Sequence, residues 1–223
     1  MPNAPQYVRH AGPEPARARK RTRTGLDAVK QWADQLDPEP EHARHVRKLA
    51  RLLFEQTRLL HALGRPELRL LEAAALLHDT GLRRGADRHH KHSRDIILAL
   101  ELPGFTEEER AVIACIARYH RRGPPQSGHR VYRDLSPEMQ GVVKILAAIL
   151  RIADGLDRTH QAATRNLRIT LNGDSCRIWV TQNPVSQVDL WGGMRKRGLF
   201  EAVFGVRVEV APEAESPPAA GER

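Results

Sequence analysis

Several polar side chains occur where the spacing of apolar residues predicts the buried face of a helix. The five that stand out are His45, His78, Asp79, His120 and Asp154. A buried polar group without a partner is destabilising, and an isolated buried carboxylate is far more so. Helices that each bury such a side chain would be stable together if a single partner bound all five side chains. The residue types therefore predict a shared divalent metal ion.

The apolar residues around these positions follow the period of an α-helix. Leu49, Leu52 and Leu53 lie four, seven and eight residues after His45, and similar stripes precede the other four residues. Each polar group takes the place of the next apolar residue on its stripe. The candidate ligands are therefore expected to face the interior of a helical bundle.

Imidazole and carboxylate ligands together indicate which ions could bind. They suit Mn²⁺, Fe²⁺, Co²⁺ or Zn²⁺ better than Mg²⁺, which prefers an all-oxygen shell. Neighbouring residues on a helix point about 100° apart, so His78 and Asp79 can serve two different ions. Two ions would hold a phosphate between them and activate a water molecule. We therefore expect a divalent metal, one or two ions of Mn, Fe, Co, Zn or Mg.

Composition restricts the class of protein. The 223 residues suit one domain of ordinary size, and the 4% aromatic content implies a core of Leu, Ala, Ile and Val. Cys115 and Cys176 form no disulfide framework and fit a reducing compartment. The chain has neither a stretch of about 20 apolar residues nor an apolar segment after its basic N-terminus. These features predict a soluble, cytoplasmic protein that does not bind membranes.

Positive charge is concentrated at the N-terminus. Residues 1–25 contain six Arg or Lys residues against Glu14 alone, a net charge of +5, so the remaining residues carry only +4 of the total of +9. A basic segment can attract nucleic acid, but no aromatic residues are interleaved with the charges and no nucleic-acid motif is present. A solvated arm is therefore favoured, and nucleic acid is not the expected partner.

The pattern of apolar residues and helix breakers predicts a mainly α fold. Helices are expected over residues 41–63, 66–79, 89–102, 106–120 and 136–157. Pro66 opens the second of these, and a capping box at Thr106 opens the fourth. After residue 163 the period changes to two, and Asn172-Gly173 signals a hairpin. A helix over 188–203 and a strand over 206–210 follow. The fold class is mainly α, a helical bundle followed by a small α+β lobe.

These elements suggest four segments. Residues 1–37 are expected to form a disordered basic arm with at most one short helix near 26–36, and residues 38–165 the helical domain. Residues 166–211 form the small lobe, and 212–223 a disordered tail. Trp179 and Trp191 in the lobe fit its core better than an interface, so a homodimer stays open.

The order His … His-Asp … Asp, formed by His45, His78, Asp79 and Asp154, resembles the metal site of the HD superfamily of phosphohydrolases. The resemblance implies a bundle of five or more helices. Members with two more histidines between the pair and the last Asp hold two metals, and His120 fits one of these. For the other, the segment 89–93 offers His89 with Ser93 on one face, and His90 as a close second.

A closer resemblance covers residues 42–210. The segments 89–93, 118–121, 150–158 and 200–205 look like the C-terminal domain of exopolyphosphatase/guanosine pentaphosphatase enzymes. In those enzymes this region follows an actin-like phosphatase core. The Gly-rich phosphate loops of that core are not found in this sequence. The ligand set looks intact, which favours a helical module with chemistry of its own.

These resemblances imply a metal-dependent phosphohydrolase. Its first ion would be bound by His45, His78, Asp79 and Asp154, and Asp79 would bridge to a second ion bound by His89 and His120, with Asp79 and Asp154 at the catalytic centre. The expected substrate is a phosphate ester, a nucleotide or polyphosphate. Five basic residues that follow the ligands are candidates for binding it: Lys91, Arg94, Arg121, Arg122 and Arg158.

Two alternatives stay open at this point. Asp157, one turn beyond Asp154, could support a ligand, act as a general base, or form a salt bridge with Arg158 or Arg151. The whole module could also be non-catalytic. It would then bind polyphosphate, a guanosine polyphosphate alarmone or a nucleotide, or serve as an accessory to a separately encoded phosphatase core.

Overall fold

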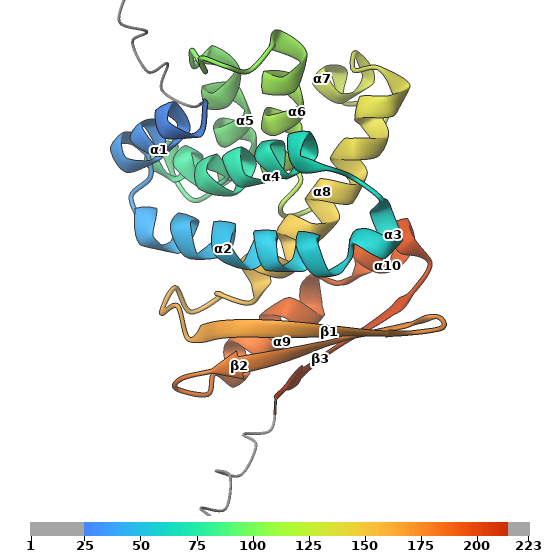
Figure 1. The fold of residues 1–223 in the computed structure, drawn as a ribbon. Coiled ribbons are helices and arrows are strands. Elements are labelled where there is room, and N and C mark those ends of the chain that lie inside the picture. Colours follow the sequence, from blue (N-terminus) through green and yellow to red (C-terminus); the bar gives the residue numbers. More distant parts are fainter. Residues whose placement is uncertain (1–24, 214–223) are drawn as a thin grey trace, which may run out of the picture.

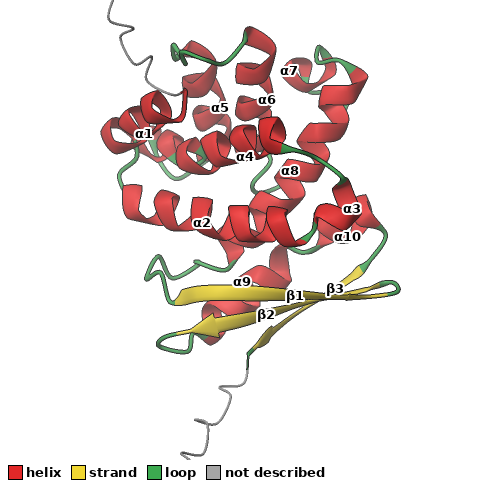
Figure 2. Ribbon diagram, viewed as in Figure 1, coloured by secondary structure: helices red, strands yellow, loops and turns green. Residues whose placement is uncertain are grey.

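Packed helices make up most of the structure. The computed structural model describes residues 25–213. Its helices up to residue 155 are α1 (Gly25–Leu36), α2 (Pro40–Gln56), α3 (Arg58–His61), α4 (Arg65–Leu77), the 3₁₀ helix η1 (Thr80–Arg84), α5 (His89–Ala99), α6 (Glu107–Arg118), α7 (Arg130–Arg133) and α8 (Pro137–Gly155). Figures 1 and 2 show them stacked above a small sheet. The predicted fold class, mainly α with a small α+β lobe, is confirmed.

Aliphatic side chains fill the centre of the bundle, where α2, α4, α6 and α8 meet. Leu49, Leu71, Ile113 and Leu146, one from each helix, have no exposed surface. Phe54 and Tyr119 are the largest side chains in this core. None of the described helices is both long enough and apolar enough to span a membrane.

Local signals fix several helix ends. The predicted capping box at Thr106 is present: the Glu109 N–H donates to Thr106 Oγ1 (3.1 Å), and the Thr106 N–H donates to Glu109 Oε2 (2.8 Å). The helix expected over 41–63 is divided at Thr57. There the hydroxyl of Thr57 donates to the Leu53 carbonyl (2.7 Å), a bond that competes with the regular helix pattern.

The one short helix that the sequence allows near residues 26–36 is present in the N-terminal segment. Helix α1 occupies residues 25–36, most of the second half of the expected disordered arm. Val29 and Ala33, four residues apart on one face, are fully buried, and α1 contacts α4. The apolar spacing is therefore enough to order this helix despite the basic residues before it. The rest of the arm, residues 1–24, and most of the expected tail, 214–223, lie outside the described residues.

The C-terminal lobe is a three-stranded sheet covered by two helices. Strands β1 (Thr164–Asn172) and β2 (Ser175–Gln182) form the predicted antiparallel hairpin, and β3 (Arg207–Pro212) pairs parallel to β2. The helix expected over 188–203 is divided into α9 (Gln187–Lys196) and α10 (Gly198–Phe204). The prediction of a core position is wrong for Trp191, which is 54% exposed, and Trp179 is half-buried.

The lobe and the bundle share one apolar core. Their buried residues form a continuous cluster, and helix α9 lies between α8 and the sheet (Figure 1). The side chain of Gln56 on α2 adds polar contacts with β1: it donates to the Leu167 carbonyl (2.9 Å) and accepts the Ile169 N–H (2.8 Å). The lobe is therefore held in a fixed position against the helices that carry the candidate ligands.

Two glycines let α8 and α9 approach closely. A Cβ at Gly155 would lie 2.5 Å from the Gly192 carbonyl oxygen, and a Cβ at Gly192 would lie 2.2 Å from the Gly155 carbonyl oxygen. Real side chains do not tolerate such contacts, and both partners here are backbone atoms that cannot turn aside. Any side chain at either position would push α9 away from the bundle.

We expect the substitution Gly192→Ala to lower the free energy of unfolding by about 1–3 kcal/mol, the usual cost of overpacking. Urea denaturation followed by circular dichroism measures this value. Gly141→Ala is the matched control, because Gly141 lies on α8 with no atom within 4 Å of its added Cβ. That substitution should leave stability unchanged or raise it by up to about 1 kcal/mol. Equal stability of Gly192→Ala and the unchanged chain would contradict the close approach.

Candidate metal centre

The end of helix α4 presents His78 and Asp79 in different directions. His78 keeps helical backbone angles, whereas Asp79 (φ −108°, ψ 4°) leaves the α-helix and precedes η1. A Cβ at Gly81 would lie 2.1 Å from the His89 carbonyl oxygen, and the Gly81 N–H donates to Ser93 Oγ (2.9 Å). This close contact places the first turn of α5 directly beside Asp79. The small residue expected at position 93 is therefore located where two helices pack.

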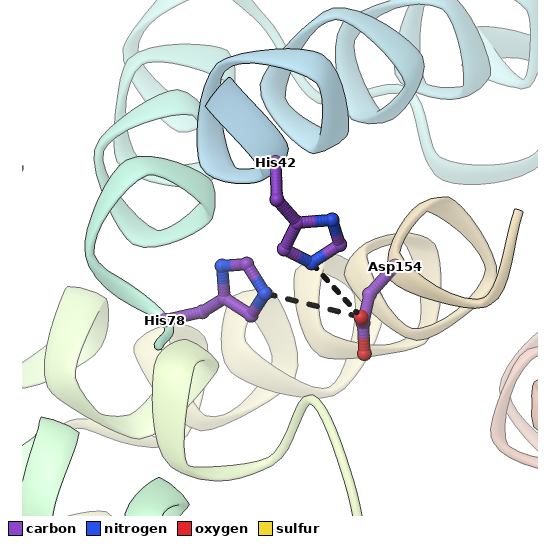
Figure 3. A group of neighbouring side chains, drawn as sticks. All are labelled: His42, His78 and Asp154. Atoms are coloured by element: carbon purple, nitrogen blue, oxygen red, sulfur yellow. Dashed lines mark ion pairs between the residues drawn. The ribbon is translucent and has the colours of Figure 1, made fainter. Parts of the chain in front are cut away.

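A first group of ligand atoms comes from α2, the end of α4, and α8. His42, His78 and Asp154 each offer one atom within 4.8 Å of the others (Figure 3). His42 Nε2 and His78 Nε2 lie 3.6 and 3.9 Å from Asp154 Oδ1. These distances exceed the usual 2.7–3.2 Å or so of a hydrogen bond, and both nitrogens are buried without such a bond among the described residues. Their arrangement fits neighbouring ligands around one cation.

A second group adjoins the first through Asp79. His89 Nε2 and His120 Nε2 lie 3.2 and 3.5 Å from Asp79 Oδ1, and 3.3 Å from each other. The other oxygen, Asp79 Oδ2, faces the first group, at 3.5 Å from His78 Nε2 and 4.0 Å from His42 Nε2. The Asp79 carboxylate therefore lies between the two groups, with one oxygen toward each.

Backbone carbonyls orient three of the imidazoles in the same way. The Nδ1 atoms of His78, His89 and His120 each lie 2.6–3.0 Å from the carbonyl oxygen three residues earlier. A carbonyl can only accept, so these Nδ1 atoms carry the proton and leave the Nε2 lone pairs facing the centre. This is the tautomer that a metal-binding histidine adopts, and it is fixed by its hydrogen bond to a carbonyl.

Asp157 orients the fourth imidazole. Its Oδ2 lies 2.8 Å from His42 Nδ1, and its Oδ1 accepts the Ala162 N–H at 2.8 Å. With both oxygens engaged and no exposed surface, Asp157 supports a ligand and is not available as a general base. The alternative salt bridges to Arg151 or Arg158 are not formed in the described structure. Arg151 instead donates to the carbonyls at the end of α6 and beyond.

The structure places His42, not His45, in the first group. The buried face of α2 contains Val46, Leu49, Ala50 and Leu53, and His42 lies on this face one turn before Val46. His45 is half-buried, and it contacts no other candidate ligand in the described structure. The structure therefore favours His42 over the expected His45 as the candidate ligand from α2.

Buried negative charge dominates the electrostatics of the centre. Burial alone would raise the pKa of Asp79, but the imidazoles of His78 and His89 beside it outweigh burial and lower that pKa. Burial likewise acts against the lowered pKa of Asp154, where the charge of Lys196 prevails. For His42, burial lowers the pKa, yet the neighbouring carboxylates of Asp154 and Asp157 raise it to about 10. The site thus strongly favours positive charge at its centre.

The five basic residues expected to bind phosphate are not grouped together. Arg121 lies at the second group, with Nη1 3.0 and 3.2 Å from the two ring nitrogens of His89. Lys91 and Arg94 line a separate cavity. Arg122 and Arg158 are exposed, and no contact within the described chain links their guanidinium groups to the ligands.

Two other charged residues near the centre escaped sequence reasoning. Lys196, at the end of α9, contacts Asp154 Oδ2 and leaves Oδ1 facing the two histidines. Asp37, just before α2, is buried, and burial raises its pKa despite an opposing bond to the Glu39 N–H. Neither residue interrupts an apolar helical stripe, which was the signal that identified the other candidates.

The chain is similar in sequence to members of a known phosphatase family. Residues 22–190 match the family model described as Ppx/GppA phosphatase, domain III. Two similar proteins are named guanosine-5'-triphosphate,3'-diphosphate pyrophosphatase: one from Pseudoalteromonas translucida, 44% identical over 129 residues, and one from Vibrio vulnificus, 27% identical over 167 residues. These alignments cover 55% and 70% of this chain, but only 25% and 31% of the relatives. The chain thus spans between a quarter and a third of the length of these curated relatives.

The geometry predicts a difference between two neighbouring histidines. We expect His42→Ala to weaken the binding of Mn²⁺ or Zn²⁺. Loss of a residue that only supports a ligand weakens binding by about 10–100-fold, and loss of a ligand itself should cost at least as much. His45→Ala removes the same side chain one turn away and should leave the affinity unchanged. Isothermal titration of metal-stripped proteins measures both. The reverse order of effects would contradict the placement of His42.

Proposed function

Because the chain belongs to the Ppx/GppA phosphatase, domain III family, we propose that it is a metal-dependent phosphohydrolase of the HD type. The observation that supports this most directly is the pair of adjoining ligand groups with the Asp79 carboxylate between them. Four imidazole rings and two buried carboxylates converge there, and His42 Nε2, His78 Nε2 and Asp79 Oδ1 have no hydrogen-bond partner in the described chain. Such a donor set is suited to one or two divalent cations.

A divalent metal at this centre would supply Lewis acidity for phosphate chemistry and lower the pKa of a water molecule. His42, His78, Asp79 and Asp154 would bind the first ion, and Asp79, His89 and His120 the second. The protein itself fixes the ligands: Asp157 and three backbone carbonyls hold the four rings. The apolar core around them keeps bulk water away from the carboxylates, which strengthens their interaction with a cation.

Two positively charged side chains at the centre would contact the substrate. Arg121 lies against His89 at the second group, and Lys196 lies against Asp154 at the first. Both sit where an anion bound between the groups would be in contact with positive charge. They would position a phosphoryl group and stabilise the charge that develops on its oxygens.

The substrate class follows from this charge pattern together with the relatives. The relatives are named for the hydrolysis of a guanosine nucleotide that carries several phosphates. We propose a phosphate ester, a nucleotide or a polyphosphate-like chain as the substrate here. A non-catalytic role is the second candidate, because the matched region is a quarter to a third of the relatives. The chain would then bind such an anion, or assist a separate phosphatase core.

One assay tests the catalytic proposal. Protein stripped with a chelator is supplied with Mn²⁺, and phosphate release is measured from p-nitrophenyl phosphate, its diester, tripolyphosphate and guanosine 5'-triphosphate 3'-diphosphate. We expect turnover of at least one substrate that depends on the added metal. Asp79→Asn should reduce turnover by more than about a hundredfold, the upper end of the loss expected for a residue that only supports a ligand, since the Asp79 carboxylate lies between the two ligand groups.

The control for this assay is Asp174→Asn, the same change at an exposed carboxylate paired with Arg207 in the lobe. It should retain full turnover. One or two equivalents of bound metal without turnover on any of the four substrates would favour the binding module. Activity that survives Asp79→Asn would exclude the proposed centre.

Lys196 gives a prediction in which two measurements move in opposite directions. Its positive charge contacts a candidate ligand, so we expect Lys196→Met to strengthen metal binding while turnover falls by about 100-fold, the order of effect for loss of one stabilising group. Lys196→Arg should restore part of the turnover. If Lys196 only supported the fold, metal affinity and turnover would fall together in Lys196→Met.

A further inference from the structure

A second polar cavity lies between α5, α6 and α7, and none of the candidate metal ligands lines it. Its volume is about 210 Å³. Three arginines, two tyrosines and one histidine form most of its wall: Arg94, Arg118, Arg130, Tyr119, Tyr132 and His129. Asp95 is the single acidic residue that lines it. The cavity is therefore partly open to solvent and carries an excess of positive charge.

Within the described residues, Arg118 has no anionic partner. It is only 9% exposed, yet its guanidinium forms neither a hydrogen bond nor an ion pair with any of residues 25–213, and its nearest aromatic contact is the Tyr119 ring, 5.6 Å away. The other two arginines are satisfied: Arg94 pairs with Asp95 (2.6 Å), and Arg130 with Asp134 (3.6 Å). Burying a cation without a counter-charge is costly, so Arg118 is placed to receive an anion from outside the chain.

The cavity is separate from the candidate metal centre. Arg118 is the last residue of α6, and His120 follows it after the cap residue Tyr119, whose backbone leaves the helix. The His120 ring packs against those of His78 and His89, with centroids 4.9 and 5.4 Å apart, whereas Arg118 lines the cavity. The end of α6 and the turn after it thus present a cation to the cavity and a candidate ligand to the metal centre.

We propose that this cavity is a second anion site, which binds a single phosphate group or an oxyanion of similar size through Arg118. A guanidinium can donate two parallel hydrogen bonds to such an anion. The volume is below the 300–1,000 Å³ or so that accommodates a drug-sized ligand, so one phosphate fits better than a whole nucleotide. Burial raises the pKa of the neighbouring Cys115 to about 12 and keeps it a thiol, so it adds no negative charge to the cavity.

Binding to the metal-free chain tests this inference independently of hydrolysis. The full chain is stripped with a chelator and titrated calorimetrically with inorganic phosphate. We expect one equivalent to bind, and Arg118→Met to weaken the affinity by about ten- to a hundredfold, because charge-assisted hydrogen bonds are lost. Arg133→Met is the matched control: it removes the same charge from α7, but its side chain is exposed and does not line the cavity.

Amide shift mapping on the unchanged chain keeps the test decisive if Arg118→Met fails to fold. Added phosphate should shift resonances of residues that line the cavity, such as Arg94 and Arg130. Those of Asp79 and His89 should stay in place. No binding at millimolar phosphate, equal binding by Arg118→Met, or shifts confined to the metal centre would each overturn the proposal.

A further titration identifies the source of the phosphate group. If the cavity takes free phosphate, tripolyphosphate should bind no more tightly than the single ion. If it takes the terminal group of a longer chain, tripolyphosphate should bind more tightly, since its other groups reach the nearby basic residues. Both results depend on Arg118 and support the site. Tripolyphosphate binding that Arg118→Met leaves unchanged would count against it.

Discussion

The structure is organised around two buried carboxylates, Asp79 and Asp154, at the centre of a helical bundle. Negative charge in an apolar interior must be compensated, because its desolvation is too costly to leave unpaired. Each compensating group comes from a different element: His42 from α2, His89 from α5 and Lys196 from α9. The bundle therefore brings together in space residues that are far apart in the sequence, and the site is its point of convergence.

The same constraint explains why the small lobe belongs to the site. Lys196 reaches Asp154 only because α9 packs directly on α8, and that contact requires Gly155 and Gly192. The sheet supports α9 from the other side, and the Gln56 side chain ties β1 to α2. A helical domain without this lobe would lack the positive charge of Lys196 beside Asp154.

The sequence predicts the fold well because its signals are local. Apolar period, the capping box at Thr106 and the Asn172-Gly173 hairpin each act within a few residues. His42 was overlooked because Val46 and Ala50, which mark its buried face, are less conspicuous than the leucines near His45. Lys196 and the choice of His89 over His90 depend on contacts between distant segments. Lys196 reaches the centre because α8 and α9 approach closely, and His89 faces it because Gly81 contacts α5.

The stability of the bundle and the charge balance of its centre have different physical origins. The apolar cluster is continuous from α1 to β3 and does not depend on the ligands, unlike small metal domains, in which metal binding supplies the folding free energy. At the centre, a proton on His42, whose pKa is raised to about 10, and the charge of Lys196 already offset part of the carboxylate charge. A divalent cation would replace the proton on the imidazole and meet the same requirement with more charge. Because the apolar core does not include the ligands, substitutions at the centre can be assayed for metal binding and turnover separately from stability.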